Sequence, residues 1–115
     1  MTIRYDGKTV YFTTQPVVFN FEVGDMIETE DSVIVRLNIP AENDTKQNVF
    51  ALQKDAKFLW QVDSSLKAYP EINVELPYEN MALLSNGNVN VSDFFGRTFE
   101  IDSQNGKILN FSVSR

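Results

Sequence analysis

Hydrophobic and polar residues alternate along much of the chain, which is the pattern of strands with one buried face. Six segments show this period of two, namely 17–23, 33–39, 72–76, 88–92, 98–102 and 109–114. Successive side chains of a strand point to opposite sides of the sheet, so each segment has one apolar face and one solvated face. Burial of one face only is typical of antiparallel sheets. The pattern therefore predicts an all-β protein with little helix.

Turn-forming residues separate these segments. The five glycines occur at Asp6-Gly7, Val23-Gly24-Asp25, Asn86-Gly87, Phe95-Gly96 and Asn105-Gly106. All five lie between the candidate strands. Three of them form Asn-Gly or Asp-Gly pairs, which supply the positive φ angles of tight hairpin turns. The polar stretches 41–47 and 63–71 are expected to be loops, the second with one helical turn capped by Asp63 or Ser64. We expect residues 1–115 to form a single all-β domain, an antiparallel β-sandwich or small open barrel of about eight to ten strands.

Composition excludes several classes of chemistry. The chain has 16 acidic residues against 10 basic ones, a formal charge of −6, and neither His nor Cys. It therefore lacks histidine, the usual proton shuttle near neutral pH. It also has no cysteine thiolate to act as a nucleophile or as a metal ligand. The acidic balance disfavours nucleic-acid binding, which depends on neutralising phosphates. No signal peptide or membrane-spanning run is evident, so we expect a cytoplasmic protein without membrane association, and no enzyme, cofactor or metal site.

Two segments of the chain echo each other. Residues 48–62 and 96–109 each run through a strand, a polar turn, a lysine and an apolar strand. These hairpins resemble those of quinoprotein-type β-propeller repeats. The pair VFAL…LWQV and G…EID…GKIL is also similar to small bacterial all-β proteins of unassigned function. Ala56 stands where the first turn would have glycine, and no quinone-pocket residues match, so the resemblance implies no cofactor.

One short segment concentrates negative charge. Five acidic residues with no basic residue between them occupy ten positions, and they are Glu22, Asp25, Glu28, Glu30 and Asp31. They could form an acidic face for a basic partner, in which Glu28 and Glu30 share one side of a strand. They could also hold calcium, although the EF-hand spacing is absent. A third interpretation is a solvated strand edge whose charge prevents association between sheets.

The loop Asp93-Phe94-Phe95-Gly96 is the second candidate site. Two consecutive phenylalanines at a hairpin tip cannot both point into one core face, because neighbouring residues alternate. We therefore predict that at least one is exposed and available for protein contact, since exposed aromatic residues are frequent interface anchors. The alternative is that the turn curls and buries both rings. Trp60 is expected in the core, whereas an exposed Trp60 or Tyr69 would suit sugar stacking.

These features favour a non-enzymatic interaction or structural protein, of bacterial or phage origin, that binds itself or a basic protein. An alternative is an immunity- or inhibitor-type protein whose acidic face covers the basic site of a partner, because complementary charge speeds such encounters. A second alternative is a small carbohydrate-binding module. The candidate partner-binding residues are Glu22, Asp25, Glu28, Glu30, Asp31, Phe94 and Phe95.

Overall fold

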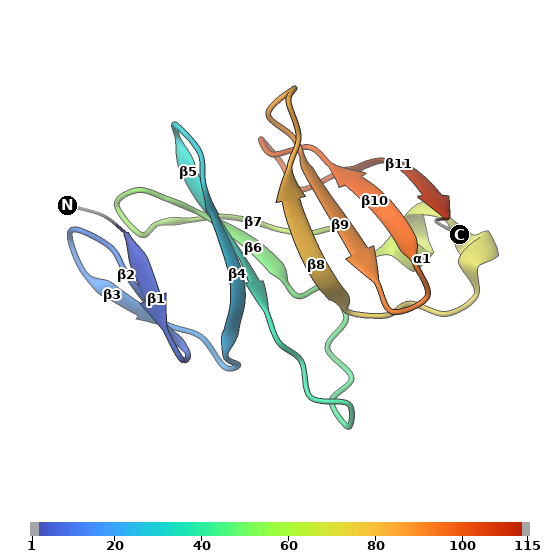
Figure 1. Ribbon diagram of the computed structural model, residues 1–115, viewed down its shortest axis with the longest axis horizontal. Helices are drawn as coiled ribbons and strands as arrows, with labels where there is room; N and C mark the ends of the chain where they lie inside the picture. The colour runs from blue at the N-terminus through green and yellow to red at the C-terminus, as the bar shows by residue number, and fades with distance from the viewer. Residues whose placement is uncertain (1–2, 114–115) are drawn as a thin grey trace.

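The computed structural model describes residues 3–113 and contains three antiparallel sheets (Figure 1). The N-terminal sheet consists of β1 (Arg4–Asp6), β2 (Thr9–Tyr11) and β3 (Pro16–Val18). The central sheet consists of β4 (Val23–Glu28), β5 (Ser32–Leu37), β6 (Val49–Gln53) and β7 (Phe58–Gln61). The C-terminal sheet consists of β8 (Tyr78–Leu83), β9 (Val89–Asp93), β10 (Arg97–Ile101) and β11 (Ile108–Val113). The predicted all-β antiparallel fold is confirmed, and no sheet closes into a barrel.

Each sheet is a meander in which strands adjacent in sequence pair with one another. The central and C-terminal sheets are connected through the short helix α1 (Ser65–Ala68) and the 3-10 helix η1 (Pro70–Ile72). The side chain of Ser64 caps α1 by accepting a hydrogen bond from the Lys67 N–H at 3.3 Å, which confirms the predicted helical turn. No helix among residues 3–113 is long and apolar enough to cross a membrane.

The central sheet is covered on both faces, so the molecule has three layers. One apolar cluster lies between the central and C-terminal sheets and includes Ile34, Trp60 and Phe99. A second cluster lies between the central and N-terminal sheets and includes Val10, Val33 and Val35. All six residues of β5 are buried as a result. The expectation that each strand has one solvated face is therefore wrong for β5, because a sheet packs on either side of it.

A buried asparagine joins two of these layers. Asn48, which is fully buried, donates from Nδ2 to the carbonyl oxygens of Leu37 (2.8 Å) and Tyr78 (2.9 Å). Its Oδ1 accepts from the Tyr78 N–H at 2.9 Å. Arg36 donates a further hydrogen bond to the Tyr78 carbonyl oxygen at 3.2 Å. Tyr78 is the first residue of β8, so these contacts set where the C-terminal sheet begins against the central one.

Gly24 lies inside β4 and not in the predicted turn. The pairing of β4 with β5 is irregular between Val23 and Asp25, which is the mark of a β-bulge at Gly24. A Cβ atom at Gly24 would collide with the guanidinium group of Arg36 and the side-chain amide of Asn38. Glycine is needed here because the buried Arg36 side chain packs directly over the backbone.

Two segments with an alternating pattern do not form the predicted strands. The pattern at 17–23 is divided between β3 and β4, and residues 19–22 between them form no strand. Phe19 and Phe21 nevertheless pack on the second apolar cluster, so their alternation reflects burial without strand pairing. Residues 72–76 contain the end of η1 and a loop. Here Glu75 faces inward and accepts hydrogen bonds from Ser64 Oγ (3.0 Å) and the Ser65 N–H (2.8 Å).

The two echoing segments share backbone geometry at their turns. Ala56 has a φ of 78° and Gly106 a φ of 79°, each just before a lysine, so alanine adopts the conformation that the second turn gives to glycine. Both hairpins also carry a register shift, between Ala51 and Leu52 in one and between Glu100 and Ile101 in the other. The bulge in the second hairpin leaves Leu109 unpaired and exposed, in contrast to the predicted burial of that position.

Trp60 is buried, as predicted, and its Nε1 donates to the Ser103 carbonyl oxygen at 3.0 Å. We expect Trp60→Ala to lower the free energy of unfolding by about 3–5 kcal/mol, because it leaves a large cavity between the sheets. Urea unfolding followed by circular dichroism measures this loss. Leu59→Ala, at the exposed neighbouring position, is the control and should change stability much less. If Trp60→Ala unfolds at the same urea concentration as wild type, the assignment of Trp60 to the core is contradicted.

Asn48→Leu is expected to destabilise the protein although leucine is close to asparagine in shape. The substitution removes the acceptor of the Tyr78 N–H and a donor to two buried carbonyl groups, which should cost about 2–4 kcal/mol. Asn80→Leu, at an exposed position of β8, should stay within about 0.5 kcal/mol of wild type. Equal effects of the two substitutions in denaturant titrations would show that Asn48 does not hold the sheets together.

Candidate functional site

The β9–β10 turn presents two phenylalanine rings to solvent. The side chains of Phe94 and Phe95 are 75% and 60% exposed, and their ring centroids lie 6.3 Å apart. Sequence alternation predicted that at least one ring is exposed, and the structure exposes both. They form the most exposed pair of adjacent large hydrophobic residues in residues 3–113.

A buried ion pair shapes this turn from beneath. Asp93 Oδ2 lies 2.8 Å from Arg97 Nε, and both side chains are buried. The other carboxylate oxygen, Oδ1, accepts from the N–H groups of Phe95 (3.0 Å) and Arg97 (3.1 Å). Gly96 closes the turn with a φ of 77° and donates its N–H to the Asp93 carbonyl oxygen at 3.0 Å. The loop backbone is therefore fixed before any partner arrives.

Arg97 also connects the turn to its surroundings. Its guanidinium carbon lies 5.5 Å from the centroid of the Phe95 ring, within the range of a cation–π contact. Its Nη1 donates to the Ile72 carbonyl oxygen at 3.4 Å, so η1 braces the same side chain. We call Phe94 and Phe95 on this turn the aromatic loop. It can bind an apolar surface, and it carries no group able to perform catalysis.

The acidic segment does not form the single face considered from the sequence. Asp25 pairs with Arg36 at 2.7 Å, and Glu28 pairs with Lys54 at 2.9 Å. Arg4, by contrast, lies over the Tyr11 ring, with its guanidinium carbon 4.2 Å from the ring centroid. Two of the five carboxylates are thus held by basic residues of β5 and the β6–β7 turn, which follow the segment in sequence.

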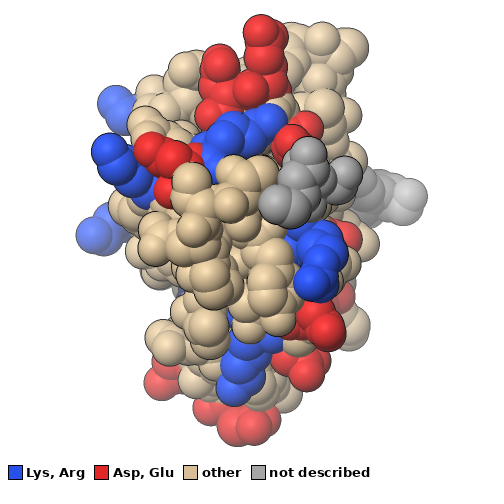
Figure 2. Space-filling view, turned by 90° about the vertical axis from the view of Figure 1, so that its left-hand side faces the viewer, with Lys and Arg blue, Asp and Glu red and all other residues tan. Residues whose placement is uncertain are grey.

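The remaining acidic residues are separated along the length of β4. Glu22 precedes the strand, whereas Glu30 and Asp31 lie in the turn after it, so Glu28 and Glu30 do not share a face of one strand. A strand rises about 3.3 Å per residue, which places the two ends of the segment roughly 20–25 Å apart. On the side of the molecule shown in Figure 2, acidic residues are dispersed among basic ones. No group of three or more acidic side chains in residues 3–113 is placed to hold a metal ion.

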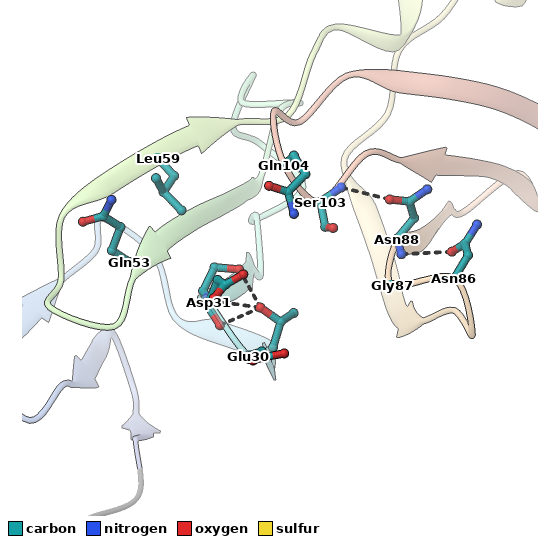
Figure 3. A pocket seen from close by; sticks show the side chains of 11 residues that line it. Glu30, Asp31, Gln53, Leu59, Asn86, Gly87, Asn88, Ser103 and Gln104 are labelled. Carbon is teal, nitrogen blue, oxygen red and sulfur yellow. Dashed lines mark hydrogen bonds between the residues drawn. The ribbon is translucent and has the colours of Figure 1, made fainter.

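A polar groove of about 490 Å³ lies where the hairpin turns of the central and C-terminal sheets meet (Figure 3). Glu30 and Asp31 line it together with the amide side chains of Gln53, Asn86, Asn88 and Gln104. Sequence analysis missed this groove because its residues come from separate turns. The amide oxygens of Asn86 and Asn88 accept from the N–H groups of Asn88 (3.0 Å) and Ser103 (3.3 Å). These amides therefore shape the turns, and the groove contains no nucleophile paired with a base.

Glu100 lies on the outer face of the C-terminal sheet within a group of asparagines. Its carboxylate accepts from the side-chain amides of Asn86 (3.0 Å), Asn88 (2.9 Å) and Asn110 (3.1 Å). Hydrogen bonds from Asn88, Asn86 and Asn110 lower the pKa of Glu100 below its ordinary value of 4.5. Of these three asparagines, only Asn110 stands opposite Glu100 in the strand register, so strand patterning alone does not reveal the group.

The aromatic residues proposed for sugar stacking do not form a platform. Trp60 is buried between the sheets, and the Tyr69 ring stacks on Phe111 with centroids 4.9 Å apart. Both rings are engaged by the core, so the carbohydrate-binding alternative lacks the stacking surface on which it depended.

The environment of Glu100 predicts a pH-dependent contribution to stability. Because its folded pKa is below the unfolded value, the contribution is present above about pH 4.5 and is lost as the pH falls through the folded pKa. Glu100→Gln should therefore lower the denaturation midpoint at pH 7 and have a smaller effect at pH 3. Glu79→Gln, on an exposed residue of β8, is the control. An equal effect of Glu100→Gln at both pH values would contradict the lowered pKa.

Comparison with known proteins adds a family to this description. The family model described as a domain of unknown function, DUF7957, matches residues 1–113. No curated protein and no solved structure gives a significant match. Since the model covers nearly the whole sequence, the chain belongs to the DUF7957 family.

Proposed function

We propose that this domain is a non-enzymatic protein-binding module that places Phe94 and Phe95 in an apolar pocket of a protein partner. The observation that carries the proposal is the exposure of both rings, 75% and 60%, on a turn with a fixed backbone. A folded protein has no stability reason to hold two adjacent aromatic rings in water. Burial of each ring in a partner would contribute about 1.5–3 kcal/mol.

The buried ion pair supports a recognition role for the turn. Burying Asp93 and Arg97 has a desolvation cost that their attraction offsets only in part, so such a pair is weak support for stability alone. Arg97 Nη2 is, in addition, buried without a hydrogen-bond partner among the described residues. What the pair does supply is a defined backbone for Phe94 and Phe95. A preorganised loop loses less conformational entropy on binding, which favours affinity.

The inhibitor-type alternative has weaker support. Asp25 and Glu28 already have basic partners within the chain, and the ends of the acidic segment are far apart. Glu30 and Asp31 beside the polar groove remain as a small acidic site for a basic side chain. Because two neighbouring carboxylates steer encounters more than they hold a complex, we place recognition at the aromatic loop.

The proposal is tested by affinity capture from the native cells with quantitative mass spectrometry. We expect Phe94→Ser/Phe95→Ser to lose the bound partner by about tenfold or more, the effect of removing interface anchors. Val18→Ser/Leu83→Ser, which removes two other exposed hydrophobic side chains, is the matched control and should retain the partner. Thermal unfolding should show all three proteins folded.

Two outcomes would contradict the aromatic loop as the binding site. The first is a partner retained by Phe94→Ser/Phe95→Ser. The second is a partner lost on Glu30→Gln/Asp31→Asn with the loop intact, which would favour the inhibitor-type alternative.

A further inference from the structure

Strand β11 is a sheet edge without a charged residue or a proline. It pairs only with β10 on one side, and no described strand pairs with the other (Figure 1). Its six residues, Ile108–Val113, include no charged residue, no proline and no glycine. Charges, proline, bulges and short length are the features by which sheet edges ordinarily avoid pairing with other chains. β11 has a bulge at Leu109, near its beginning, and pairs with β10 in regular register from Asn110 to Val113. Leu109 and Val113 on this strand are 49% and 52% exposed.

The other five edge strands in residues 3–113 are each protected. β1 and β3 have three residues each, and β3 begins with Pro16. β4 and β8 lie beside each other and both carry acidic residues. β7 has four residues, and just beyond its end the Asp63 N–H donates to the Gly106 carbonyl oxygen at 3.1 Å. Among the edge strands of residues 3–113, β11 is thus the only one of six residues that carries no charge.

From this comparison we propose that β11 pairs antiparallel with β11 of a second copy of the chain, about a two-fold axis at Phe111. This register sets Phe111 opposite Phe111, Leu109 opposite Val113, and Asn110 opposite Ser112 of the second copy. Directly opposed residues in an antiparallel pair lie on the same face of the sheet. Apolar residues therefore meet apolar ones on one face, and polar residues meet polar ones on the other.

The neighbouring register centred on Asn110 is less favourable. Moving the axis to Asn110 sets Val113 against Lys107 and Ser112 against the core-facing Ile108. Charge also favours the pairing at β11. Two copies with a formal charge of −6 each repel, and the uncharged β11 is an edge where their backbones can approach with least repulsion. A second copy fits because the strand is complementary to itself.

The paired edges join two four-stranded sheets into one continuous sheet. Arg97 stands opposite Val113, so the aromatic loop lies near the C-terminal end of β11. In an antiparallel pair these ends point in opposite directions, so the dimer carries its two aromatic loops at opposite ends. Both loops stay accessible, and a partner with two binding sites would gain affinity from simultaneous engagement.

Light scattering after size exclusion tests the pairing. Across a dilution series, wild type is expected to reach twice the chain mass of 13.1 kDa, and Leu109→Lys/Val113→Lys to stay at the monomer mass. In the proposed register the two lysines face each other across the interface, where like charges destabilise pairing. Leu83→Lys is the matched control, because Leu83 is 51% exposed on the opposite edge of the same sheet, and it should dimerise as wild type does.

A charge-complementation experiment tests the register. Leu109→Glu/Val113→Glu alone should also be monomeric, and mixing it with Leu109→Lys/Val113→Lys should restore a particle of twice the chain mass. In hydrogen exchange, every second amide of β11 should be slow in wild type and fast in the lysine variant. Circular dichroism confirms that each variant is folded.

A monomeric wild type, or a lysine variant that still dimerises, would overturn the proposal. Failure of the mixture to dimerise would overturn the register. Phe94→Ser/Phe95→Ser should remain dimeric. A loss of dimerisation in that variant alone would place self-association at the aromatic loop and contradict pairing at β11, so the two proposals fail separately.

Discussion

The backbone of Tyr78 is held by the side chains of Asn48 and Arg36, and this contact aligns the C-terminal sheet with the central sheet. Its consequences extend into the central sheet. Arg36 must be buried to reach Tyr78, so it needs Asp25 as a counter-ion and glycine at position 24 to leave space. The bulge in β4 follows from the same requirement. One polar contact between layers therefore determines several residues that otherwise look unrelated.

The alternating pattern correctly predicted the strands that have one buried face and one solvated face. β9 and β10 have buried Val and Phe on one face and polar residues on the other, and they were assigned correctly. The segment 17–23 was misassigned because Phe19 and Phe21, although only partly buried, pack on the core while the chain passes from one sheet to the next. An alternating hydrophobic pattern shows which side chains pack on the core. A loop that packs on the core can have this pattern as well as a strand.

The polar contacts between layers were beyond prediction for a different reason. Asn48 and Tyr78 are 30 residues apart, and neither lies in a motif. Glu75 occupies a polar position of an apparent strand, yet it binds the beginning of α1. Such residues have the composition of a solvated surface, and only the way the layers are stacked places them inside.

The candidate site was predictable in part. Alternation indicated that Phe94 and Phe95 could not both point into one core face, and the structure exposes both because the turn does not curl over them. The ion pair beneath the loop was missed, because Asp93 and Arg97 flank the turn and look like ordinary surface charges in the sequence. The acidic segment misled for the opposite reason. Its residues are close in sequence, but an extended strand separates them in space.

The charged residues are concentrated on some surfaces of the molecule and are absent from others, which affects where another protein can bind. The acidic residues of β4 lie on a strand edge, where they are paired with Arg36 and Lys54 and discourage contact with other sheets. The aromatic loop and β11 lack exposed charge of their own. At physiological salt, charges act over about 8 Å, so repulsion from the rest of this acidic chain is weak at surfaces beyond that distance. Association at the loop would therefore depend on apolar burial, and association at β11 on backbone hydrogen bonds. The negative charge thus disfavours contact where acidic residues are exposed, and the two surfaces that we propose for binding carry none of these residues.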